Sequence, residues 1–145
     1  MRAIIQRVTR ASVTSNGEPA GQIGMGLCVL VGVTHTDAVA EAVKLAEKIW
    51  HVRVFDDADG VMNVPVGHVG GQVLVVSQFT LYGDTSRGRR PSWIDAARPE
   101  HAEPLIDEVV AALRRLGATV ATGRFRTDMQ VELVNDGPVT VMLEV

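Results

Sequence analysis

Hydrophobic and polar positions along the first part of the chain predict strands. Residues 2–14 are rich in β-branched side chains and alternate between apolar and polar positions in their second half, which is typical of a strand with one buried face. Asn16 and Gly17 follow directly, and this dipeptide favours a two-residue hairpin turn. The continuous apolar run from Leu27 to Val33 predicts a strand that is covered on both faces.

Two later segments repeat their apolar residues with the period of a helix. The first covers residues 37–50, and Thr36 or Asp37 is available to cap its N-terminus. The second carries its stripe over residues 105–116, and Gly117 is suited to end it. The apolar positions of the two stripes are Ala38, Val39, Ala42, Val43, Ala46, Ile49 and Trp50, and Leu105, Ile106, Val109, Val110, Leu113 and Leu116.

The remaining apolar segments predict further strands. They cover residues 52–55 and 73–76, and then Met129–Val134 and Val139–Val145. Strands in this number, combined with two amphipathic helices, indicate an α+β fold with a mainly antiparallel sheet and the helices on one face. The length of 145 residues predicts a single domain over residues 1–145.

The composition is that of a folded chain, since 46% of the residues are hydrophobic and 21% are charged. The formal net charge is −3, so the chain lacks the broad basic field of a protein that follows a long nucleic-acid backbone. Any contact with RNA is therefore expected to be confined to a small region.

Several features predict a cytoplasmic protein. The single cysteine, Cys28, cannot form an intramolecular disulfide, and its apolar surroundings favour a packed thiol in a reducing compartment. No apolar stretch reaches the roughly 18–20 residues that span a bilayer, so we expect no membrane association. The first residues, 1–7, look like a strand and not like a signal peptide.

Most familiar catalytic motifs are missing. None of the four histidines belongs to an H-E-x-x-H pair, and one cysteine adds no ligand cluster, so we expect no metal site. The acidic residues near position 57 hint at a calcium loop, but Phe55 and Val66 would fall on its first and last ligand positions. Neither a phosphate-binding glycine loop nor a nucleophile elbow is present, and we expect no cofactor.

The segment from Ser77 to Asp84 comes directly after a predicted buried strand. The end of a strand leaves backbone N–H groups unpaired, and together with small hydroxyl groups these can hold an oxyanion or a ribose. Phe79 can stack on a base. An ordinary polar strand end with a core phenylalanine is the alternative interpretation, and spacing alone does not exclude it.

Two further segments are open to more than one interpretation. Residues 135–138, Asn-Asp-Gly-Pro, lie between two predicted strands and suit a plain hairpin turn, but a proline at the start of the second strand removes a ladder donor. The three arginines of residues 87–90 lie near Trp93 and can meet phosphate groups at one point. A solvated turn explains these arginines equally well.

At these segments the sequence resembles the D-aminoacyl-tRNA deacylase family, and the resemblance covers nearly the whole chain. Residues 77–81, Ser-Gln-Phe-Thr-Leu, match the active-site motif of the family, and residues 135–140, Asn-Asp-Gly-Pro-Val-Thr, match its second motif. Residues 1–8 and 89–92 also fit. Two long motifs in this order and at this separation are highly specific, and they favour a functional role for both segments.

The resemblance implies a homodimer with a compact, barrel-like β-rich fold that hydrolyses the ester of D-aminoacyl-tRNA and of glycyl-tRNA. Its pocket would take the 3′-terminal adenosine with the attached amino acid, as a step of chiral proofreading in translation quality control. The Gly137-Pro138 bond would be cis and would reach into the partner's pocket to reject L-amino acids, with Met129 as a further substrate-binding residue. The residues at the ester would be Ser77, Gln78, Phe79 and Thr80.

The sequence departs from the family pattern in three places. Gly83 stands where the family usually has alanine, and Trp93 stands where phenylalanine is common. Arg126 and Thr127 stand where the family usually has Gly-Ala. If this last pair lines the pocket, we expect a difference in substrate entry or in the preferred tRNA.

Two other functions remain open on the sequence. An editing domain of the same fold would remove a wrong L-amino acid, such as serine from threonyl-tRNA. The lack of a synthetase body and the presence of Gly137-Pro138 argue against it. A non-catalytic protein that binds an RNA end or a nucleotide would use Phe79 and the three arginines.

Overall fold

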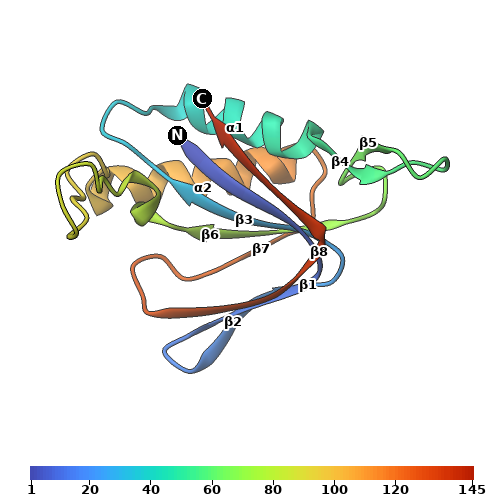
Figure 1. Cartoon of the computed structure of the whole chain (residues 1–145), viewed down its shortest axis with the longest axis horizontal. Coiled ribbons are helices and arrows are strands. Elements are labelled where there is room, and N and C mark those ends of the chain that lie inside the picture. The colour runs from blue at the N-terminus through green and yellow to red at the C-terminus, as the bar shows by residue number, and fades with distance from the viewer.

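The computed structural model describes residues 1–145 and confirms the predicted α+β fold. Figure 1 shows both α-helices on one side of the sheet, whereas the hairpin of β1 and β2 curls away from them. In chain order the elements are β1 (Arg2–Ser15), β2 (Glu18–Ile23), β3 (Gly26–Gly32), α1 (Val39–His51), β4 (Arg53–Asp56), β5 (Met62–Pro65), β6 (Gln72–Ser77), the 3-10 helix η1 (Phe79–Tyr82), α2 (Pro99–Arg115), β7 (Val120–Thr122) and β8 (Met129–Glu144).

Strand β1 organises the main sheet, whose order is β2-β1-β3-β6-β7 with β8 also paired to β1. One edge of β1 pairs with β8, while the other edge pairs with β3 over residues 2–8 and with β2 over residues 11–15. All pairing around β1 is antiparallel, as predicted, whereas β3–β6 and β6–β7 are parallel. Parallel neighbours require long crossovers, and α1 and α2 lie in these connections.

The sheet separates two buried clusters, so β3 is covered on both faces as its sequence predicts. Val29 and Val31 belong to the larger cluster beneath the helices, and Cys28 belongs to the smaller cluster inside the curl of the sheet. Burial raises the pKa of the Cys28 thiol to about 11, in agreement with a packed thiol. Gly21 on β2 approaches β7 so closely that an added Cβ would lie 2.5 Å from the Thr122 carbonyl oxygen. This close approach of β2 to β7 accompanies the barrel-like curvature of the sheet.

Neither Thr36 nor Asp37 caps α1, so this part of the prediction is wrong. The N-cap residue is Ala38, and its N–H donates to the Glu41 carboxylate at 2.9 Å. The Asp37 carboxylate is buried and instead accepts a hydrogen bond from the Met1 ammonium group at 2.7 Å. This ion pair ties the start of β1 to the start of α1.

Helix α2 begins at Pro99, earlier than its apolar stripe predicts, because its first turns are largely polar. Proline is well suited to the first helical position, where a missing N–H loses no partner. The predicted end at Gly117 is confirmed, since this residue has φ of +102° and the Ala118 N–H donates to the Leu113 carbonyl at 3.0 Å. Neither helix is long and apolar enough to cross a membrane.

A bulge interrupts β8 at the place where a hairpin turn was one interpretation of the sequence. Both halves of β8 pair antiparallel with β1, so the chain keeps its direction through residues 135–138 and the hairpin interpretation is wrong. The residues between the paired positions, 136–139, stand opposite the single residue Arg7. The second family motif therefore lies in a bulge that is flanked on both sides by residues paired with β1.

We expect Asp37→Asn to lower the free energy of unfolding by about 3–5 kcal/mol, because the buried Met1 ammonium group would lose its anionic partner. Urea unfolding followed by circular dichroism measures this loss. Arg10→Gln is the control, since it breaks the exposed ion pair with Glu132 and should cost less than about 1 kcal/mol. An equally small effect of Asp37→Asn would contradict the proposed importance of the buried pair.

Candidate active site

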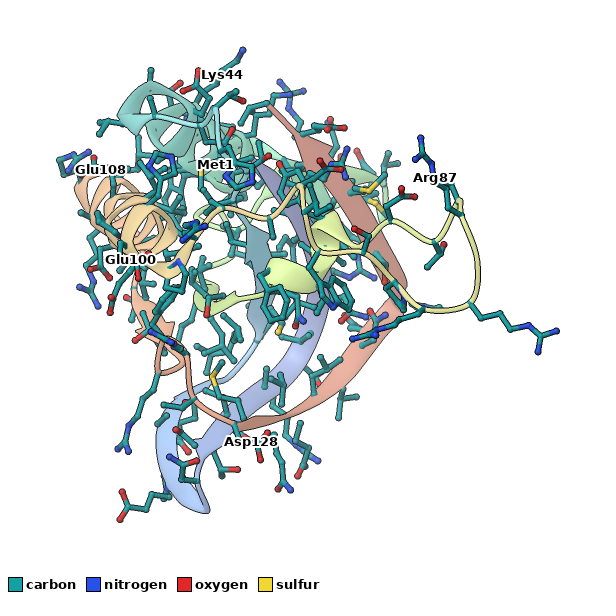
Figure 2. All side chains as sticks on the ribbon, turned by 90° about the vertical axis from the view of Figure 1, so that its left-hand side faces the viewer. Met1, Lys44, Arg87, Glu100, Glu108 and Asp128 are labelled. Carbon is teal, nitrogen blue, oxygen red and sulfur yellow. The ribbon has the colours of Figure 1, made fainter.

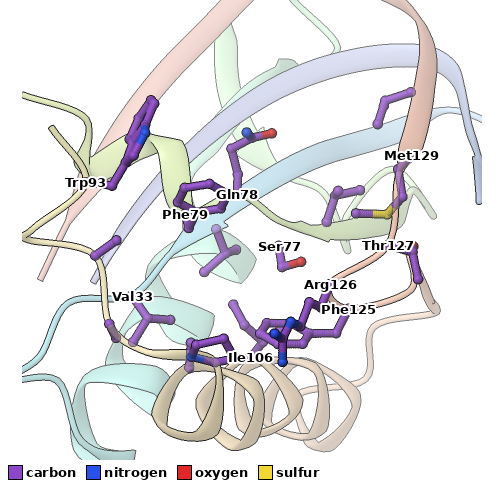
Figure 3. Close-up of a pocket in the computed structure, with 17 residues that line it drawn as sticks. Val33, Ser77, Gln78, Phe79, Trp93, Ile106, Phe125, Arg126, Thr127 and Met129 are labelled. Atoms are coloured by element: carbon purple, nitrogen blue, oxygen red, sulfur yellow. The ribbon is translucent and has the colours of Figure 1, made fainter. Parts of the chain in front are cut away.

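A cavity of about 590 Å³ lies where β6 ends, between η1, the first turns of α2 and the loop that joins β7 to β8 (Figure 3). This volume is in the range of sites for small ligands. Twelve of the seventeen residues in its wall are hydrophobic. The cavity therefore offers an apolar surface with few polar groups, and the position of these groups decides its chemistry.

Ser77, Gln78 and Phe79 line the cavity because β6 ends there. Figure 3 shows the Ser77 side chain near the middle of the cavity. The Gln78 N–H donates to the Val31 carbonyl at 2.7 Å, which anchors the start of η1. The next two N–H groups, those of Phe79 and Thr80, have no acceptor in the chain, because the first N–H groups of a helix lack partners within it. The Phe79 N–H is thus an available backbone donor in the cavity wall, and the Thr80 N–H follows it in the first turn of η1.

The Thr80 side chain differs from the other predicted catalytic residues. It is exposed and does not belong to the cavity wall. Its hydroxyl accepts a hydrogen bond from the side-chain amide of Gln78. No histidine or carboxylate lines the cavity, so no general base stands ready to activate a hydroxyl nucleophile there.

Phe79 and Trp93 form an aromatic edge at the mouth of the cavity, with ring centroids 5.4 Å apart and planes at 73°. Phe79 is 56% exposed, so its interpretation as a core residue is wrong. Gly83 lies against the indole ring, where an added Cβ would stand 2.5 Å from Cζ3 of Trp93. Two departures from the family pattern therefore compensate each other, because the smaller residue at 83 makes room for the larger one at 93.

The loop between β7 and β8 contributes Arg126 and Thr127 to another part of the wall, and the first residue of β8, Met129, lies beside them (Figure 3). The Thr127 hydroxyl accepts a hydrogen bond from the Ser15 hydroxyl at 2.7 Å and donates to the Arg124 carbonyl at 2.9 Å. Arg126 has φ of +58°, in the left-handed region. Arg126 and Thr127, which depart from the resembled family pattern, thus line the cavity. We therefore expect substrate entry or tRNA preference to differ from that of relatives with Gly-Ala at these positions.

Gly137 and Pro138 lie outside this cavity, in the exposed bulge of β8, and the peptide bond between them is cis. Arg7 supports the bulge from within the sheet and is only 9% exposed. Its Nε donates to the Asp136 carbonyl at 3.3 Å, and its Nη1 donates to the Val54 carbonyl at 2.8 Å. Within one copy of the chain, the structure therefore does not bring the two family motifs together.

The three arginines of residues 87–90 project from an exposed loop. Hydrogen bonds of 2.9 and 2.8 Å between the backbones of Asp84 and Ser92 close this loop at its base. Figure 2 shows Arg87 extending away from the body of the molecule. None of the three forms an ion pair within the chain, so their guanidinium groups are accessible to phosphate.

Arg2 and Arg7 position the two motifs, and no local pattern in the sequence predicted either role. The Arg2 guanidinium lies 4.6 Å from the centre of the Tyr82 ring and donates to the Leu81 carbonyl at 3.4 Å, so β1 holds η1 in place. Burial raises the pKa of Tyr82 to about 12, and its hydroxyl therefore stays protonated at neutral pH. The one feature that could have identified Arg7 is its position: a charged residue stands where the alternation of β1 requires an inward-facing side chain.

Comparisons with known proteins agree with the resemblance. The family model of D-Tyr-tRNA(Tyr) deacylase matches residues 4–144. The D-aminoacyl-tRNA deacylase of Heliobacterium modesticaldum is 58% identical over 144 residues, which cover 99% of this chain and 96% of that protein. The protein of the same name from Streptomyces coelicolor is 56% identical over 146 residues, which cover 100% of both chains.

Two solved structures share the fold. One, described as a c-Myc DNA unwinding element binding protein, matches with a TM-score of 0.94 at 39% identity and covers 100% of this chain and 99% of its own. The other, described as a probable eukaryotic D-amino acid tRNA deacylase, has a TM-score of 0.83 at 16% identity, covers 99% and 98%, and supports the fold alone. Fold, cavity and sequence together define a deacylase, a hydrolase that acts on carboxylic ester bonds. The chain belongs to the D-Tyr-tRNA(Tyr) deacylase family.

We expect Gly83→Ala to displace the Trp93 ring and to lower the free energy of unfolding by about 1 kcal/mol or more, because the new methyl group overlaps the indole. Adding Trp93→Phe should restore most of this loss by removing the ring that is in the way. A double-mutant cycle in urea, with ester hydrolysis measured in parallel, gives the coupling energy. Strictly additive effects would show that the two departures do not compensate each other.

Proposed function

We propose that the protein hydrolyses the ester bond of D-aminoacyl-tRNA to free tRNA and D-amino acid and leaves L-aminoacyl-tRNA intact. It would thus proofread chirality for translation in the cytoplasm. The observation that carries this proposal is the apolar cavity at the active-site motif, where η1 begins and the N–H groups of its first residues, Phe79 and Thr80, are left without partners in the helix. Family membership supplies the substrate class, and the cavity has the volume for a terminal nucleoside with its amino acid.

The chemistry that we propose depends on backbone donors and not on a triad. Hydrolysis of an activated ester passes through a tetrahedral oxyanion, and each well-placed N–H group can stabilise it by roughly 3–4 kcal/mol. The Phe79 and Thr80 N–H groups are the candidates for this role, with the Ser77 hydroxyl and the Gln78 side chain nearby. A 2′-hydroxyl of the substrate itself gains effective concentration by proximity, so it can assist the attack without a protein base.

We further propose that the active unit is a homodimer in which Gly137 and Pro138 of each copy enter the cavity of the other. Three features support this assembly. The edge of β8 that faces away from β1 has no partner strand, and unpaired edges of this length are usually protected. The bulge is exposed and firmly anchored, and β8 also exposes apolar side chains at Val131 and Val134. Two-fold pairing places the same strand of both copies at one interface.

The backbone atoms of Gly137 and Pro138 would form a wall of such a site, and this wall would distinguish D- from L-amino acids. A steric clash with an L side chain can supply the roughly 5.5 kcal/mol that corresponds to 10⁴-fold rejection. Glycine has no side chain that could clash with this wall. Relative to D-alanine it loses only one methyl-sized contact, which costs about 1–3 kcal/mol of binding free energy. Glycyl-tRNA is therefore expected to be a substrate as well.

A single assay separates this proposal from its two alternatives. The protein is incubated with D-tyrosyl-, L-tyrosyl- and L-seryl-tRNA, and release of each amino acid is followed. We expect release of D-tyrosine alone. Release of L-serine would favour an editing domain, whereas binding of all three tRNAs without release would favour a non-catalytic protein that recognises RNA ends.

We expect Thr80→Ala to reduce single-turnover deacylation only moderately, by roughly 10-fold or less, because its hydroxyl has no base to activate it. Rapid-quench measurements with D-tyrosyl-tRNA determine the rate. Complete loss of hydrolysis with unchanged tRNA binding would instead identify the Thr80 hydroxyl as an essential nucleophile.

We expect Gly137→Ala to weaken D-tyrosyl-tRNA hydrolysis and to reduce the ratio of D to L rates. Gly137 has φ of +119°, and an added Cβ would lie 2.8 Å from Cγ2 of Val139 and 3.0 Å from Nη2 of Arg7, so the bulge must shift. Gly60→Ala is the matched control, since Gly60 also has positive φ, at +74°, but no atom within 4 Å of the added Cβ. Full retention of rate and ratio in Gly137→Ala would argue against a role of this segment in chiral selection.

A further inference from the structure

Arg126 is the one charged residue in the cavity wall, and no part of the proposed chemistry uses it. It forms no ion pair in the chain, although the neighbouring Arg124 pairs with Glu18 at 3.3 Å. Its guanidinium group also makes no hydrogen bond to another residue, and the side chain is exposed. A free guanidinium group in a mainly apolar wall is available to an anionic part of the ligand.

The backbone at Arg126 adds a second observation. Its φ of +58° is a conformation that is common for glycine and uncommon for a long side chain. The hydrogen bonds of the Thr127 hydroxyl to Ser15 and Arg124 hold the loop in this shape. The loop therefore presents an arginine at a strained position, where glycine is the residue that the resembled family usually has.

The substrate offers two kinds of anion to this guanidinium group. Every tRNA carries a phosphate on the 5′ side of its terminal adenosine, whereas only an acidic amino acid carries a side-chain carboxylate. The amino acid also bears an α-ammonium group beside the ester, and a guanidinium group disfavours a cation at close range. Phe79 and Arg126 lie on different sides of Ser77 in the cavity (Figure 3), so a ligand whose ester is bound at η1 extends another of its parts toward Arg126. Charge favours the phosphate for this contact.

We propose that Arg126 binds the 5′-phosphate of the terminal adenosine and so determines how tightly this protein holds its substrate. The proposal rests on the function proposed above and names a contact within the same site. The contact is a charge-assisted hydrogen bond that orients the nucleotide, and it takes no part in the bond that breaks. A glycine at this position has no side chain with which to make it.

Small substrates that differ by one phosphate test the contact directly. The 3′-O-D-tyrosyl esters of adenosine 5′-monophosphate and of adenosine are hydrolysed by the wild-type chain and by Arg126→Gln and Arg126→Lys. Both substitutions keep a side chain at the strained position. We expect Arg126→Gln to lower kcat/KM roughly tenfold for the phosphorylated ester, mainly through KM, and to leave the unphosphorylated ester unchanged. Arg126→Lys should retain part of the preference, because it keeps the charge.

Arg124→Gln is the matched control, since Arg124 lies in the same loop but pairs with Glu18 and does not line the cavity. It should preserve the preference for the phosphorylated ester. Equal losses for both esters in Arg126→Gln would overturn the proposal and assign a structural role. A loss confined to D-aspartyl adenosine, compared with D-asparaginyl adenosine, would also overturn it, because the anion would then be the side-chain carboxylate.

Binding of adenosine 5′-monophosphate and of adenosine, measured by calorimetry, separates this proposal from the proposed function. If the wild-type chain hydrolyses no D-ester, the proposed function fails, yet the calorimetric comparison still tests Arg126. We expect the wild-type chain to bind the monophosphate roughly tenfold more tightly than adenosine, and Arg126→Gln to bind the two equally. Equal binding of both by the wild-type chain would overturn the phosphate contact.

Discussion

The buried charge of Arg7 is the constraint on which the arrangement of the site depends. Its guanidinium group lies inside the sheet, with carboxylate oxygens of Asp56 and Asp136 at 3.5 and 3.4 Å and two backbone carbonyls as acceptors. Removal of a charge from water is costly unless partners replace the solvent. If residues 136–139 paired regularly with β1, the Asp136 carbonyl and carboxylate would no longer reach the guanidinium group. The bulge of β8 therefore keeps the buried charge of Arg7 hydrogen-bonded.

Strand β8 connects this bulge to the cavity. Met129 and Val131 on its first half line the cavity, whereas the bulge lies further along the same strand and faces outward. One copy of the chain thus has an open cavity and an exposed, rigidly held glycine and proline. In the dimer that we propose, each copy closes the cavity of the other. Gly137 and Pro138 of one copy would then distinguish D- from L-amino acids, while the backbone N–H groups of η1 in the other copy would stabilise the oxyanion. In this proposal, the division of roles lets a chain with so few polar groups in its cavity both select and hydrolyse its substrate.

The sequence predicted those parts of the fold in which burial repeats with a fixed period. The helical stripes and the apolar run of β3 were predicted well, because burial on one or both faces leaves a regular pattern. The cap of α1 was not, because Asp37 pairs with an ammonium group 36 positions away in the chain. Such a long-range ion pair leaves no local signal in the sequence. The motif predicted Gln78 and Phe79 as site residues, and both line the cavity, whereas the exclusion of the Thr80 side chain depends on the turn of η1.

A mixed dimer tests most directly whether the site is shared between copies. Ser77→Phe should fill the cavity of its own chain, and Gly137→Val should distort the bulge of its own chain, so each variant alone is expected to be nearly inactive. Co-expression with two different tags allows the mixed dimer to be isolated and assayed with D-tyrosyl-tRNA. One of its two sites combines the intact cavity of one chain with the intact bulge of the other, so we predict about half of the wild-type activity per dimer. A mixed dimer as inactive as its parents, or a chain that is active as a monomer, would contradict the shared site.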